Sequence, residues 1–100
     1  MTKLTSKSVS GTSFHNITIK TTLSNLIKVL GEPQCFQNDG EDKTNVDFEC
    51  ETESGDVFTI YDWKEYKPIG MDETIEFHIG GHSSSVTRQA KSELLDLLSK

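Results

Sequence analysis

A double glycine followed by three serines has the residue types of a ligand-binding turn. Gly80-Gly81-His82-Ser83-Ser84-Ser85 follows an expected strand and leads into an expected helix. N–H groups at a helix start can hold an anion, to which serine hydroxyls and Arg88 would add donors. This hypothesis assigns a phosphorylated ligand to Gly80, Gly81, His82, Ser83, Ser84 and Arg88. No GxxxxGK[ST] or GxGxxG pattern is present, so a glycine turn with an ordinary serine cap is the alternative.

The histidines and cysteines have no spacing that predicts a metal site or a nucleophile. His78 is expected on a strand and His82 beyond two glycines, so their separation has no helical meaning, and His15 is remote in sequence. Cys35 and Cys50 lack metal-type spacing and have no histidine nearby in the sequence. We therefore expect no metal, no cofactor and no catalytic residue, and interpret both cysteines as reduced thiols.

Carboxylates are concentrated between residues 39 and 56, where Lys43 is the one basic residue. The acidic residues there are Asp39, Glu41, Asp42, Asp47, Glu49, Glu51, Glu53 and Asp56. Such a density can imitate a phosphate array and occupy a basic groove on another protein. Solubility and protection of a sheet edge are the simpler alternative.

Alternation in three strands adds aromatic residues to this acidic surface. One face carries the aliphatic and aromatic residues Val46, Phe48, Cys50, Phe58, Ile60, Ile75, Phe77 and Ile79. Helices should cover that face, and Leu26 should join its core. The opposite, open face carries Asp47, Glu49, Glu51, Thr59, Tyr61, Trp63, Glu76 and His78. Aromatic and acidic side chains there form a candidate partner-binding surface. The alternative is that Tyr61 and Trp63 pack under the residues of 1–20 or 64–72.

The elements that position these residues can be read from periodicity. Strands are expected at 15–20, 46–51, 57–63 and 74–79, with Gly80-Gly81 ending the last. Leu23, Leu26, Ile27 and Leu30 predict a helix capped by Thr21 or Thr22 and ended by Gly31 and Pro33. Ser84 or Ser85 should cap a second helix that carries Val86, Ala90, Leu94 and Leu97. The order β-α-β-β-β-α predicts an α+β fold: a three- to four-stranded antiparallel sheet with two helices on one face.

Composition limits the classes of partner. The chain has 100 residues, 26% charged residues and a formal charge of -6, which fits one folded domain over residues 14–100 with a loose arm over 1–13. A negative chain is not expected to bind nucleic acid or an anionic membrane directly. No apolar run approaches the roughly 20 residues of a membrane span, and the N-terminus has no apolar signal core. A cytoplasmic location is therefore expected.

Three pieces of the chain, ITIKTTLSNLIKVLGEP, GDVFTIYDWKEYKP and IEFHIGGHS, resemble small accessory proteins of bacteriophages and prophages over about residues 14–95. The resemblance implies a protein of the infected bacterial cytoplasm, of the kind that inhibits host machinery or defence, anti-CRISPR proteins included. The helix followed by Leu30-Gly31-Glu32-Pro33 and a strand pair also resembles the half-repeat of β-lactamase inhibitory proteins and outer-membrane assembly lipoproteins, which implies a shared general architecture only.

Two functions are therefore expected, with an enzyme a distant third. The first is a non-enzymatic, phage-encoded inhibitor that docks its acidic surface on a basic, nucleic-acid-binding host protein such as a defence effector. The second is a small-ligand binder that takes a nucleotide-like molecule at Gly80–Ser85, with Arg88 and Trp63 contributing charge and stacking.

Overall fold

The computed structural model describes residues 2–33, 35–36, 46–63 and 69–99 of the chain. In chain order the elements are β1 (Lys3–Leu4), β2 (Ser13–Thr22), α1 (Leu23–Leu30), β3 (Cys35–Phe36), β4 (Val46–Glu51), β5 (Val57–Tyr61), β6 (Thr74–Gly81) and α2 (Ser84–Leu98). The predicted α+β class with an antiparallel sheet and two helices is confirmed.

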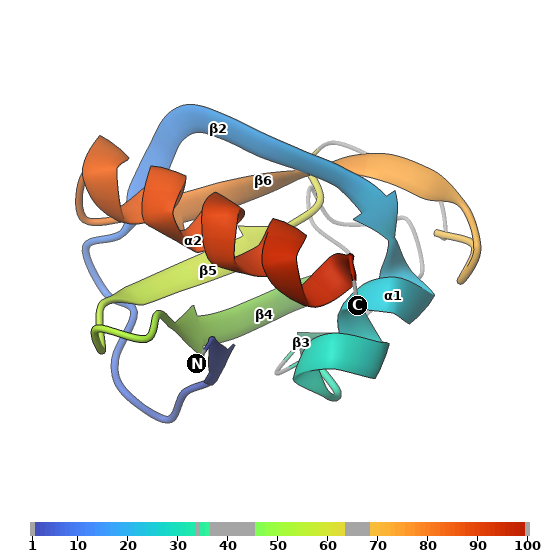
Figure 1. The fold of residues 1–100 in the computed structure, drawn as a ribbon, viewed down its shortest axis with the longest axis horizontal. Helices are drawn as coiled ribbons and strands as arrows, with labels where there is room; N and C mark the ends of the chain where they lie inside the picture. The colour runs from blue at the N-terminus through green and yellow to red at the C-terminus, as the bar shows by residue number, and fades with distance from the viewer. Residues whose placement is uncertain (1, 34, 37–45, 64–68, 100) are drawn as a thin grey trace.

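The sheet has more strands than the three or four expected. Its strands follow the order β1-β4-β5-β6-β2, and β3 pairs with β4 off this path (Figure 1). Every pair is antiparallel. The additional strands β1 and β3 have two residues each, too few for an alternation signal. Within the segment expected to be a loose arm, Lys3–Leu4 pairs with β4, and Thr2 and Thr5 on either side are buried.

The first helix follows the sequence prediction closely. The Thr22 hydroxyl accepts a hydrogen bond from the N–H of Asn25, as an N-cap does. Gly31 has a φ of 104° and donates its N–H to the Ile27 carbonyl at 2.8 Å. A positive φ favours glycine because other residues clash there, which explains why the helix ends at this point.

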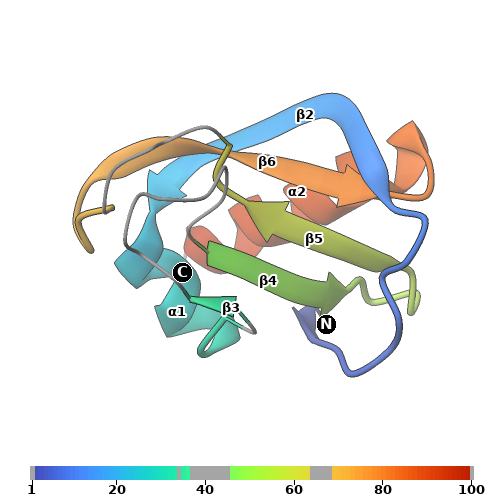
Figure 2. The same ribbon diagram turned by 180° about the vertical axis from the view of Figure 1, so that it is seen from behind.

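The face predicted to be the core is buried. Its members are Val46, Phe48, Cys50, Phe58, Ile60, Ile75, Phe77 and Ile79, joined by Ile19, Leu23, Leu26, Ala90 and Leu94. Helix α2 lies across this face, and α1 packs beside the C-terminal end of α2 (Figure 1). Figure 2 shows the reverse view, in which β4, β5 and β6 lie in front of α2. The opposite sheet face is not covered by either of the described helices.

Glu93 joins two distant parts of the chain to helix α2. It accepts hydrogen bonds from the Thr2 hydroxyl, from the N–H of Glu53 at 3.0 Å and from the Gln89 side chain at 2.8 Å. Gln89 also donates to the Ser54 hydroxyl at 3.1 Å. The N-terminus and the β4–β5 turn are thereby fixed to the helix that covers the core.

Two details near the second helix differ from expectation. Strand β6 continues through Gly80 and Gly81 instead of ending before them, because both glycines pair with β2 and β5. The helix is capped by Ser83, not by Ser84 or Ser85: the Ser83 hydroxyl accepts from the N–H of Val86 at 3.3 Å. The longer strand leaves only His82 and Ser83 between the two elements.

Candidate functional site

Four rings meet on the open face of the sheet, and we call them the aromatic cluster: Phe14, Tyr61, Trp63 and His78. Phe14 stacks on His78 with ring centroids 4.2 Å apart and planes 15° from parallel. Trp63 lies 6.4 Å from His78 at 28°. Tyr61 stands edge-on to both, 5.6 Å from His78 and 6.4 Å from Trp63. Phe14 remains 39% exposed and Trp63 42% exposed, so the cluster presents apolar surface to solvent.

Gly80 lies beside this cluster. Its Cα pairs with Thr59 on one side and Phe14 on the other. A Cβ at this position would lie 2.7 Å from the Thr59 hydroxyl oxygen and 3.5 Å from Cε1 of Tyr61. The absent side chain therefore leaves room for the Thr59 hydroxyl, whereas the distance to the Tyr61 ring would be an ordinary contact.

A carboxylate pair adjoins the cluster on β4. Asp47 pairs directly with Tyr61, and Tyr61 pairs with His78 on the next strand. Partial burial, the charge of Glu49 and a hydrogen bond that the protonated Asp47 carboxyl makes to Glu49 raise the pKa of Asp47 to about 6. Burial and the Asp47 charge raise the pKa of the Tyr61 hydroxyl. Acidic and aromatic groups thus lie within electrostatic reach, in surroundings that disfavour further negative charge.

The remaining acidic residues of the expected surface have local partners or are not described. Glu51 accepts a hydrogen bond from the Lys7 ammonium at 3.0 Å, which lowers its pKa. Glu76 accepts from the Thr18 hydroxyl at 3.1 Å. Asp39, Glu41 and Asp42 lie outside the described residues. The structure therefore brings together Asp47, Glu49, Tyr61, Trp63 and His78 as the centre of the predicted surface, with Glu51 and Glu76 at its margins.

The glycine–serine turn is engaged in packing. A Cβ on Gly81 would lie 2.9 Å from Cγ2 of Thr87 and 3.3 Å from Cγ1 of Val86, so glycine here allows α2 to approach β6 closely. The Gly81 carbonyl accepts a hydrogen bond from the His15 ring at 3.0 Å. Neither Gly80 nor Gly81 has a positive φ, contrary to what a strained loop would require.

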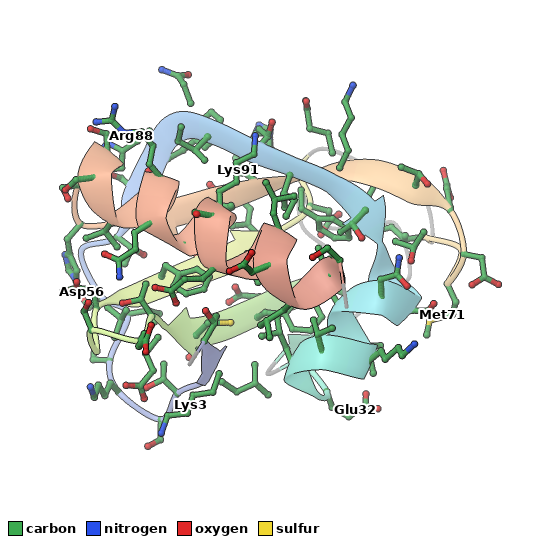
Figure 3. All side chains as sticks on the ribbon, viewed as in Figure 1. Lys3, Glu32, Asp56, Met71, Arg88 and Lys91 are labelled. Carbon is green, nitrogen blue, oxygen red and sulfur yellow. The ribbon has the colours of Figure 1, made fainter. Side chains whose placement is uncertain are left out.

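The polar members of the turn contact one another. Arg88 donates to the Ser84 carbonyl at 3.4 Å and to the Ser84 hydroxyl at 3.3 Å. Figure 3 shows Arg88 at the N-terminal end of α2, on the periphery of the molecule. The Ser83 hydroxyl caps the helix, and His82 is exposed. These contacts give the turn a structural role and leave the phosphate hypothesis without a further supporting observation.

Phe14 is the site residue that the sequence did not reveal. It stands just before the strand expected at 15–20, and the chain is irregular there: Phe14 pairs with Gly80 but Thr18 pairs with His78. Asn16 has a φ of 65° within this bulge. Only the neighbouring position of β2 and β6 shows that Phe14 meets His78.

Other kinds of site find no support within the described residues. They contain no cluster of three or more His, Cys, Asp or Glu side chains that could hold a metal ion. Cys50 is buried in the core, and burial raises the pKa of its thiol, which disfavours a nucleophilic role. Neither helix of the described ranges is long and apolar enough to cross a membrane.

No protein-family model, curated protein sequence or solved structure matches the chain. Function is therefore argued from the site alone. Exposed aromatic rings beside a carboxylate pair can bind a cationic, partly apolar group, because the rings supply contact area and a negative face and the carboxylates supply charge.

Proposed function

We propose that this protein is a non-enzymatic binding protein that docks the open face of its sheet on a basic surface of another protein. The observation that carries the proposal is the aromatic cluster, with Phe14 and Trp63 exposed on the face opposite the helices. Aromatic anchors surrounded by polar groups are typical of protein–protein contacts.

The charge of the face decides the chemistry of the partner. Asp47 and Glu49 lie on the strand next to Tyr61, and the whole chain carries a formal charge of -6. A basic partner would be attracted over a distance and would favour the ionised form of Asp47, whereas phosphates would be repelled. The aromatic cluster offers rings on which bases can stack, but the carboxylates beside it repel phosphates. A nucleic acid is therefore a poor occupant of this face.

The biological setting follows from the resemblance to bacteriophage accessory proteins over about residues 14–95. On that basis the partner is a basic, nucleic-acid-binding protein of the bacterial host, such as a defence effector, and the site of action is the bacterial cytoplasm. This chain would occupy the groove of the host protein that otherwise holds nucleic acid. Its carboxylates would thereby compete with the phosphates for the basic residues of that groove.

The experiment is a capture from nuclease-treated bacterial lysate with three immobilised forms. They are the native chain, the double variant Asp47→Lys with Glu49→Lys, and a control with Glu32→Lys and Asp96→Lys. Both control positions are exposed and lie away from the site; Figure 3 shows Glu32 beyond α1. The two variants have the same net charge, so non-specific attraction changes equally.

We expect a nucleic-acid-binding protein that the native chain and the control retain, that the site variant loses, and that a DNA oligonucleotide displaces. Equal loss in both variants would show non-specific charge attraction and would overturn the proposal. Equal retention in both variants would overturn it as well. Circular dichroism of all three forms checks that the fold is unchanged. The exposed control changes should cost within about half a kcal/mol each, whereas Asp47 and Glu49 are partly buried.

A further inference from the structure

The open face contains a row of side chains that runs from charge to aromatic surface. The Cα register places Asp47 opposite Tyr61, Tyr61 opposite His78, and His78 opposite Thr18. Neighbouring strands are about 4.8 Å apart, so roughly 10 Å separate the backbone of Asp47 from that of His78. A long side chain with a charged tip and an apolar stem can span that distance.

Three of the rings along this row are stacked with their planes nearly parallel. Phe14, His78 and Trp63 lie within 28° of parallel in the two stacked contacts that His78 makes, and Tyr61 closes the row edge-on. The stacked arrangement leaves Phe14 and Trp63 as the exposed outer members. Planar groups therefore gain more contact here than a compact, rounded group does.

We propose that the aromatic cluster and the carboxylates of Asp47 and Glu49 form a subsite for one arginine side chain of the partner. This inference rests on the proposed function and deepens it by naming the group that is recognised. A guanidinium is planar, stacks on aromatic faces and presents paired donors to a carboxylate. A lysine ammonium is a compact and strongly hydrated charge that gains little from stacked rings.

The chain contains a single tryptophan, Trp63, so its fluorescence reports on this subsite directly. The probes are acetylated and amidated hexaarginine and hexalysine, titrated at about 150 mM salt, where exposed charges beyond roughly 8 Å are screened. We expect hexaarginine to bind about five- to tenfold more tightly than hexalysine and to change the Trp63 emission.

Three variants separate stacking from charge. Phe14→Ala should reduce the affinity for hexaarginine to that for hexalysine. Leu95→Ala, which removes another exposed apolar side chain (48% exposed) on helix α2, should keep the preference. Asp47→Asn combined with Glu49→Gln should weaken both peptides, because it removes charge and retains the size of both side chains.

The outcomes distinguish this inference from the proposed function. Equal affinities for the two peptides would overturn the arginine subsite, and so would a preference for hexaarginine that remains in Phe14→Ala. Docking on a basic protein is tested separately by the lysate capture. Stronger quenching by single-stranded oligothymidine than by either peptide would assign the rings to base stacking and overturn both. Phe14 is exposed, so Phe14→Ala should fold. Circular dichroism and the melting temperature check that all the variants compared are folded.

Discussion

Phe14 of β2 and His78 of β6 stack with ring centroids 4.2 Å apart and planes 15° from parallel. They are not direct cross-strand partners, since Phe14 pairs with Gly80 and His78 pairs with Thr18. The contact lies next to the bulge that shifts the register between Phe14 and Thr18. The Phe14–His78 contact thus joins two strands that belong to distant parts of the sequence.

Gly80→Ala should displace the Thr59 side chain and lower stability. The added Cβ would lie 2.7 Å from the Thr59 hydroxyl oxygen, so the Thr59 side chain must shift, whereas the 3.5 Å to Cε1 of Tyr61 is an ordinary contact. Overpacking of this kind costs about 1–3 kcal/mol. Thermal unfolding measures the loss, and the Trp63 emission shows whether the cluster has moved.

Gly70→Ala is the matched control for this change. Its nearest neighbour would be Cβ of Glu73 at 3.5 Å, an ordinary contact, so the melting temperature should change little. Equal effects of the two substitutions would show that Gly80 has no special part in accommodating the Thr59 side chain.

Asp47→Asn should stabilise the protein at pH 7.5 but not at pH 4. The folded-state pKa of Asp47, about 6, lies above its ordinary value of 3.8 because of burial and the neighbouring Glu49. A raised pKa contributes stability that is fully present below about pH 3.8 and is lost as the pH rises through about 6. Asparagine does not ionise, so the variant avoids that loss.

Denaturant unfolding at the two pH values measures this difference, with Asp96→Asn on the exposed side of α2 as the control. An advantage of Asp47→Asn that is the same at both pH values would mean that ionisation of Asp47 has no influence on stability. The expected result would show that the ionised Asp47 carboxylate lowers the stability of the folded protein.

Alternation along β4, β5 and β6 was sufficient to predict the core face, because a one-residue shift would have exposed Phe48 and Phe77. It did not predict that Thr59, expected on the open face, is buried. The two-residue strands and the β2 bulge could not be predicted, since neither leaves a periodic signal. The role of Gly81 was also missed. Its need for close approach to α2 depends on packing between elements, which a single sequence does not show.

Glu93→Gln should destabilise the protein at neutral pH, and the difference should disappear in acid. Partial burial raises the pKa of Glu93, but hydrogen bonds from Thr2, Gln89 and the Glu53 N–H together lower it below its ordinary value. A lowered pKa gives stability that is present above the unfolded value of about 4.5 and is lost as the pH falls through the folded value. Hydrogen bonds to a partly exposed charged group suggest a loss of about 1 kcal/mol at pH 7.

Unfolding of Glu93→Gln and of Asp96→Gln, both on α2, would be compared at pH 7 and pH 3. Only the first should lose stability at neutral pH. Hydrogen exchange at the N–H of Glu53 gives a local measurement, because this group donates to Glu93 at 3.0 Å. Unchanged protection there would contradict the fastening role of Glu93.

Gly81→Val and Arg88→Ala together test whether the glycine–serine turn binds a phosphorylated ligand or only supports the fold. Valine at Gly81 would collide with Thr87 and Val86 of helix α2, so we expect a loss of about 1–3 kcal/mol of stability. Arg88 is exposed, and its hydrogen bonds to Ser84 lie within helix α2. Its replacement should therefore change stability by less than about 0.5 kcal/mol. Amide chemical shifts of Gly80 to Arg88 would be followed with nucleoside phosphates at millimolar concentration. The packing role predicts no shifts in the native chain, whereas shifts that Arg88→Ala abolishes would establish a phosphate site at this turn.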